Sequence, residues 1–153
     1  MESIKHALGE TVGGKAVVGL LDAVKRGDPD SIDGTQALAQ FDRLTRGLHP
    51  VEFLSVVREA LGFLSRPQRL ALGELLQAHA RYSQLTTPGL MKQGLQDPNE
   101  IAPSLQALHQ EDPELVVQLL GSEFRDLPVM KLALAALAGV AGKHSVLPAG
   151  QLR

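Results

Sequence analysis

The sequence predicts an all-α fold, and three observations carry this prediction. Apolar residues recur at spacings of three and four along most of the chain, as on one face of a helix. Proline and glycine interrupt these stretches at positions typical of helix starts and ends. No stretch alternates apolar and polar residues with the β-branched side chains that strands favour. We therefore expect seven or eight short helices in an orthogonal or helical-hairpin bundle.

The first half of the chain predicts four helices, because each apolar stripe is bounded by a residue that starts or stops a helix. Oxygen-bearing side chains cap helix N-termini, proline suits the first turn, and glycine suits the position after a helix. The first helix carries a stripe through residues 16–24 and is stopped by Gly27-Asp28-Pro29. Asp33 and Gly47 bound the second helix, and Pro50 opens the third. Ser65 and Pro67 open a fourth helix, which ends near residue 82.

The second half predicts shorter helices that are opened mainly by prolines. Proline inside a helix removes a hydrogen bond and causes a kink or a later start. The expected elements are a short helix within residues 90–95, helices opened by Asp97-Pro98 and Asp112-Pro113, an interruption at Pro103, and a last helix from Pro128 to near Gly142, Lys143 and His144.

A weak internal period offers an alternative to a closed bundle. Pro67, Pro98 and Pro128 follow one another at spacings of 31 and 30 residues, and each precedes similar apolar positions. A helical hairpin repeated at this length would stack as a short α-solenoid-like array. Proline-started helices of average length would give the same spacing by chance, and we favour that interpretation.

Length and composition indicate one globular domain. The 153 residues fall within the range of about 100–200 residues for a single domain. A content of 44% hydrophobic but only 3% aromatic residues predicts a core of Leu, Val and Ala. We expect a single helical domain over residues 1–144 and a flexible tail over residues 145–153. A cytoplasmic location is expected, because no signal-peptide core and no apolar run of about 20 residues is present.

The sequence contains no recognisable active site. There is no cysteine, no HExxH and no Gly-x-Ser-x-Gly. The segment Gly9–Ala16 has the spacing of a phosphate-binding loop, but Ala16 replaces the hydroxyl residue that would bind Mg²⁺, so a flexible turn is favoured. A metal site from His49, His79 and His109 would require the repeat, and surface or helix-end histidines are favoured. The sequence offers no candidate catalytic residue, metal site or cofactor, and it favours a protein without enzymatic activity over an enzyme.

Arginines are concentrated in the centre of the chain. The net charge of the whole chain is −2, which gives no general attraction to nucleic acid or anionic membranes. Residues 43–81, however, include six arginines and only three glutamates. A solvated helix face with Glu–Arg pairs explains most of this excess. The alternative is a set of phosphate contacts, for which the candidates are Arg43, Arg46, Arg58, Arg66 and Arg69.

The last predicted helix is apolar on nearly all sides, with Lys131 as the exception. Such a helix lies in the centre of a fold or is shared with another subunit. Membrane contact is a third alternative, which the short length disfavours. The candidate residues for a homo-oligomer interface are Met130, Leu134, Leu137, Ala138 and Ala141.

These observations favour a non-enzymatic helical module that binds a protein partner or itself. They leave open two other functions. One is a nucleic-acid-associated protein that uses the central arginines. The other is a helical bundle that binds a small ligand.

Overall fold

The computed structural model describes residues 19–82, 98–121 and 123–151, and every regular element in these ranges is a helix. The all-α prediction is confirmed, while the short helix expected within residues 90–95 lies outside the described ranges. A first helical stretch covers residues 19–26. It is followed by the 3₁₀ helix η1 (Pro29–Ser31), α2 (Gly34–Thr45), α3 (Pro50–Leu61), α4 (Arg66–Tyr82), α6 (Pro98–Glu111), α7 (Pro113–Leu120), the 3₁₀ helix η2 (Glu123–Asp126) and α8 (Pro128–Gln151).

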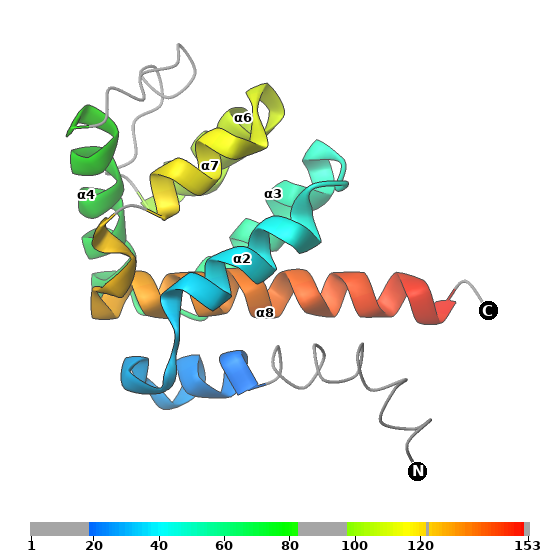
Figure 1. Ribbon diagram of the computed structural model, residues 1–153, viewed down its shortest axis with the longest axis horizontal. Helices are drawn as coiled ribbons and strands as arrows, with labels where there is room; N and C mark the ends of the chain where they lie inside the picture. Colours follow the sequence, from blue (N-terminus) through cyan, green and yellow to red (C-terminus); the bar gives the residue numbers. More distant parts are fainter. Residues whose placement is uncertain (1–18, 83–97, 122, 152–153) are drawn as a thin grey trace.

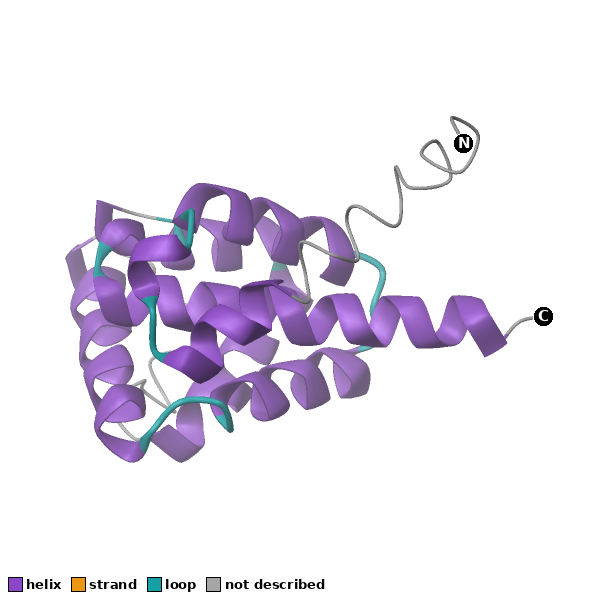
Figure 2. Ribbon diagram, turned by 90° about the horizontal axis from the view of Figure 1, so that it is seen from below, coloured by secondary structure: helices purple, strands orange, loops and turns teal. Residues whose placement is uncertain are grey.

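Helix α8 is the centre of the bundle. It packs against α2, α3, α4 and both 3₁₀ helices, and all residues from 132 to 142 are buried. Figure 1 shows α2 and α3 on one side of α8 and the helical residues 19–26 on the other, with α4 across one end. The same central position is seen from below in Figure 2. In a solenoid each repeat contacts only its neighbours, whereas here early helices contact the last one, so the helices form a closed bundle.

Local signals in the sequence set several helix ends. Gly27 has a φ of 65°. Its N–H donates to the carbonyl of Val24, and the next N–H donates to Ala23, which is a Schellman ending. At the start of α2, the Asp33 carboxylate accepts hydrogen bonds from the backbone N–H groups of Thr35 and Gln36. These capping predictions are confirmed.

Helix α6 begins at Pro98, as Asp97-Pro98 predicts, and it continues through Pro103, so the alternative of a late start at the inner proline is excluded. One predicted boundary is wrong. Helix α8 continues to Gln151 rather than ending near Gly142, and the backbone of residues 145–151, which we expected to be a tail, extends this helix. A glycine allows a helix to end but does not force it to. The next two residues, Lys143 and His144, both contact Glu59 of α3, at 3.0 and 3.2 Å, and this anchors α8 beyond the glycine.

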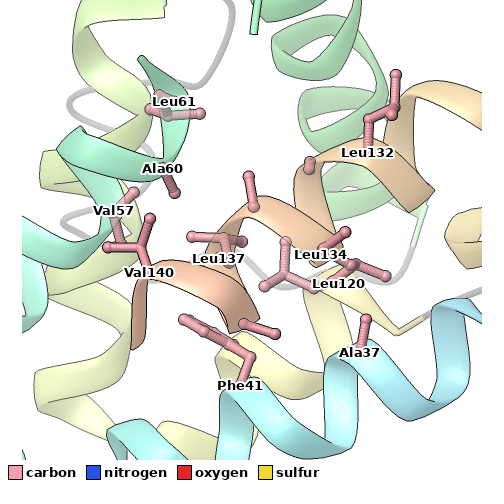
Figure 3. Close-up of a cluster of buried hydrophobic side chains, with 14 of the residues drawn as sticks. Ala37, Phe41, Val57, Ala60, Leu61, Leu120, Leu132, Leu134, Leu137 and Val140 are labelled. Carbon is pink, nitrogen blue, oxygen red and sulfur yellow. The ribbon is translucent and has the colours of Figure 1, made fainter. Parts of the chain in front are cut away.

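The core forms where α8 meets the helices around it (Figure 3). Phe41 of α2 and Val57 of α3 lie against α8 together with Leu120 of α7, and all three are almost fully buried. Small residues on α8 allow close approach, since a Cβ atom on Gly139 would overlap the side chain of Leu21. The core is therefore mostly aliphatic, as the composition predicts.

Candidate anion-binding pocket

A pocket of about 450 Å³ lies where the end of α3 meets the starts of α4 and α6. Its walls combine arginine side chains with a small apolar surface, and none of the described residues that line it is acidic. The lining residues are Arg58, Leu61, Gly62, Arg66, Arg69, Asn99 and Ala102.

The corner between α3 and α4 brings the arginines together. Gly62 is the C-cap of α3. Ser65 and Gln68 form reciprocal hydrogen bonds at the start of α4, because the Ser65 hydroxyl accepts from the Gln68 N–H at 3.2 Å and the Gln68 side chain accepts from the Ser65 N–H at 2.8 Å. This short, capped turn places Arg58 in the last turn of one helix close to Arg66 and Arg69 in the first turn of the next.

Arg69 is held in place by the end of α3. Its Nη1 donates to the carbonyl oxygens of Leu61 and Leu64, at 3.3 and 3.1 Å, and the side chain is half-buried. The last carbonyls of a helix lack partners within the helix and carry partial negative charge. Arg69 therefore closes α3 and fixes one wall of the pocket at the same time.

Arg58 and Arg66 have a different environment. Both side chains are exposed, and neither forms an ion pair with a carboxylate among the described residues. The starts of α4 and α6 bring the positive ends of two helix dipoles to the same region, where the end of α3 brings one negative end. The pocket is thus electropositive, and its positive charge has no compensating carboxylate in its described walls.

The other two candidate arginines lie elsewhere, on α2. Arg43 donates to the side chain of Gln40 at 2.8 Å. Arg46 contacts Asp42 at 2.6 Å and Glu114 at 3.5 Å, and the hydrogen bond with Asp42 raises the pKa of Arg46. The structure therefore brings together three of the five predicted arginines, while the other two contact side chains on the surface of α2 and α7.

The structure places the candidate interface residues of α8 in the core of the single chain. Packing against α2, α3 and α4 buries them, and none is more than 2% exposed. These residues are Met130, Leu134, Leu137, Ala138 and Ala141. The burial supports the central-helix interpretation of α8, because a second copy cannot contact these side chains while the bundle is closed.

His109 is a buried group that we expected on the surface or at a helix end. It lies in the last turn of α6, but it is only 9% exposed and stacks on Phe53 with ring centroids 4.0 Å apart. Its Nε2 has no hydrogen-bond partner among the residues that the structure describes. Burial lowers the pKa of His109, the charge of Arg46 lowers it further, and Asp42 acts in the opposite direction. The signal for this burial was its position four residues after Leu105 on the apolar stripe.

The remaining histidines do not form a metal site in the described part of the chain. His49 precedes α3, and its N–H donates to Glu52 at 3.1 Å, while His144 contacts Glu59. Across residues 19–82, 98–121 and 123–151, no group of three metal-binding side chains is found. The side chain of His79 and the segment Gly9–Ala16 lie outside what the structure describes.

Comparisons with known proteins do not assign the chain to a family. In the described ranges, no helix has both the length and the apolar character needed to cross a membrane. No protein-family model matches the sequence, and neither a curated protein nor a solved structure shows significant similarity to it.

Proposed function

We propose that this protein binds a small anionic ligand in the arginine pocket, defined as the pocket lined by Arg58, Arg66 and Arg69. One observation carries the proposal: three guanidinium groups from two helices line one concave site whose described walls contain no carboxylate. Like charges repel, so placing three arginines around one site without a carboxylate in its described walls has a cost in stability. An anionic ligand offsets this cost when it binds.

The size of the pocket favours a small molecule. Sites for small ligands usually enclose about 300–1,000 Å³, and the arginine pocket has a volume of about 450 Å³. Leu61 and Ala102 add apolar surface beside the guanidinium groups. This combination of a few polar groups with an apolar wall is typical of ligand sites.

Nucleic-acid binding is less well supported. A nucleic acid presents a row of phosphates, and proteins bind it through basic groups spread along that row. Arg43 and Arg46 lie apart from the arginine pocket, and Arg46 is engaged by Asp42 and Glu114. The charges that remain form a compact group, which suits one ligand better than a phosphate backbone. The protein-interaction module stays an untested prediction.

Binding of pyrophosphate by isothermal titration calorimetry tests the proposal. Replacing Arg58 and Arg66 together by Gln keeps the approximate size of the side chains and removes two charges. Hydrogen bonds to charged groups contribute about 1.5–3 kcal/mol each, so we expect the double variant to weaken binding at least about tenfold. Arg43→Gln is the matched control, because Arg43 lies outside the pocket. Equal affinities in all three proteins, or no binding by the unmodified chain, would refute the proposal.

A further inference from the structure

We propose that the ligand of the arginine pocket is a small phosphomonoester, with its phosphate at Arg58 and Arg66 and its organic part against Leu61 and Ala102. This inference rests on the proposed function and makes it more specific. It depends on three features of the described residues: the helices from which the cations come, their total charge, and the apolar side chains that line the same pocket.

The arrangement of the cations suits a tetrahedral anion. A planar carboxylate is satisfied by one guanidinium, which donates two parallel hydrogen bonds to it. Here Arg58 comes from the end of α3, Arg66 and Arg69 come from the start of α4, and the start of α6 forms a further side through Asn99. Groups that approach from several elements match the three terminal oxygens of a phosphomonoester better than the two oxygens of a carboxylate.

The charge of the site points the same way. A phosphomonoester carries about −1.5 to −2 at pH 7, whereas a carboxylate or a sulfate monoester carries one negative charge. Arg69 uses Nη1 on the carbonyls of Leu61 and Leu64. Two exposed guanidinium groups, Arg58 and Arg66, remain without a carboxylate partner among the described residues. A dianion would neutralise these two charges.

The apolar wall indicates that the ligand is more than inorganic phosphate. Leu61 and Ala102 are 7% and 3% exposed, so they present little surface, and that surface faces the pocket. Gly62 lies beside them and carries no side chain that could fill the space. A small organic group attached to the phosphate would cover the little surface that these two side chains expose.

A matched series of three probes tests the inference on the full chain: phenyl phosphate, phenyl sulfate and benzoate. They share one ring and differ in the anionic group. At about pH 7.5 we expect phenyl phosphate to bind at least about tenfold more tightly than either of the others, because its second pKa of about 6 makes it a dianion. Between about pH 7.5 and 5 its affinity should fall about tenfold, since the dianion becomes a monoanion.

The probe series includes a control for changes in the protonation of the protein itself. Glu59, next to Arg58 in sequence, has a pKa lowered by Lys143 and stays ionised over this range. His144 also contacts Glu59. Phenyl sulfate has no proton to gain in this range, so any change in its affinity reports on the protein, and the expected result is that its affinity stays constant.

Each outcome separates this inference from the proposed function. Failure of all three probes, together with pyrophosphate, would overturn both. If phenyl sulfate or benzoate binds as tightly as phenyl phosphate, the phosphomonoester proposal is overturned, but the proposed anion site stands. If inorganic phosphate binds as tightly as phenyl phosphate, the proposal that the ligand carries an organic group would be refuted. A phosphoserine peptide or a DNA duplex that binds at least about tenfold more tightly than phenyl phosphate would show that the ligand is not a small molecule. The double variant Arg58→Gln with Arg66→Gln should lose the preference for phenyl phosphate.

Discussion

The core around α8 and the corner between α3 and α4 differ in how their side chains are buried and how their charges are compensated. In the core, all residues from 132 to 142 are buried and packed by apolar neighbours. At the corner, Arg58 and Arg66 are exposed beside Arg69, and no carboxylate among the described lining residues compensates them. Natural sequences tend to satisfy local physical preferences throughout a fold and to violate them where a function requires it. The difference therefore locates stability in the core and a candidate function at the corner.

A charge placed in the core gives the largest expected effect. Leu134 is fully buried on α8. Leu134→Asp would bury a carboxylate without a partner, which lies among the changes that cost more than about 4–5 kcal/mol. We expect circular dichroism to show no cooperative unfolding. Leu134→Met is the control, because a swap that conserves volume usually costs less than about 1.5 kcal/mol. A folded Asp variant with an altered mass in solution would contradict the core assignment and support an interface on α8.

The contact between Gly139 and Leu21 tests how closely the core is packed. A Cβ atom at Gly139 would overlap Cγ and Cδ2 of Leu21. Overpacking costs about 1–3 kcal/mol, so Gly139→Ala should destabilise the protein despite the better helix propensity of alanine. In a Leu21→Ala background the overlap is gone, and the same change should stabilise the protein by up to about 1 kcal/mol. Chemical denaturation of the unmodified protein, the two single variants and the double variant gives this double-mutant cycle. If the changes in the free energy of unfolding are additive, the close contact is contradicted.

Arg69 belongs to both regions, because it closes α3 and lines the pocket. Arg69→Met keeps most of the stem and removes the hydrogen bonds to Leu61 and Leu64. Hydrogen bonds to charged groups contribute about 1.5–3 kcal/mol each when buried. For this half-buried side chain we expect a total loss of about 1–2 kcal/mol in urea denaturation.

Arg66→Met is the matched control for Arg69. The side chain of Arg66 is exposed, and surface changes usually stay within about 0.5 kcal/mol. We expect Arg66→Met to be neutral or slightly stabilising, because it also removes a repelling charge. Equal losses in the two variants would show that the corner does not depend on the contacts of Arg69.

His109 should give the smallest effect, seen as a change in the pH dependence of stability. Burial lowers its pKa below the ordinary value of 6.5, so the unfolded chain gains the proton before the folded chain does. The stability contribution of the neutral ring is complete above pH 6.5 and is lost as the pH falls toward the pKa of the folded state. His109→Phe keeps a ring on Phe53 and removes this titration. Urea denaturation should therefore show a weaker decline under acidic conditions, and an unchanged decline would contradict the prediction.

More of the fold than of the candidate site could be predicted from the sequence. Gly27 and Asp33 are local signals, and their effects depend on a few neighbouring residues, so the helix ends that they mark are correct. The apolar surface of α8 on all sides likewise indicates its central position. Its true end was missed because the contacts of Lys143 and His144 with Glu59 link residues more than eighty positions apart in the chain.

The arginine pocket depends on three helices, and sequence spacing alone does not bring them together. The concentration of arginines was visible, but Arg43 and Arg46 could not be separated from the other three without the turn at Gly62 and Ser65. Asn99 and Ala102 reach the pocket only because α6 packs on α3. The burial of His109 was missed in a different way, because its position four residues after Leu105 on the apolar stripe of α6 was a signal that our sequence prediction did not use.

The central helix α8 follows, in the chain, the helices that pack against it, so it is synthesised after them. Helix α2 ends at Thr45 and finds its main partner in α8, which begins at Pro128. During translation the apolar faces of α2 and α3 leave the ribosome well before the helix that covers them. Contacts between segments so far apart in sequence slow folding, and apolar surfaces that stay uncovered promote aggregation. The nascent chain thus completes its core only after α8 emerges, and until then the apolar faces of α2 and α3 lack their main packing partner.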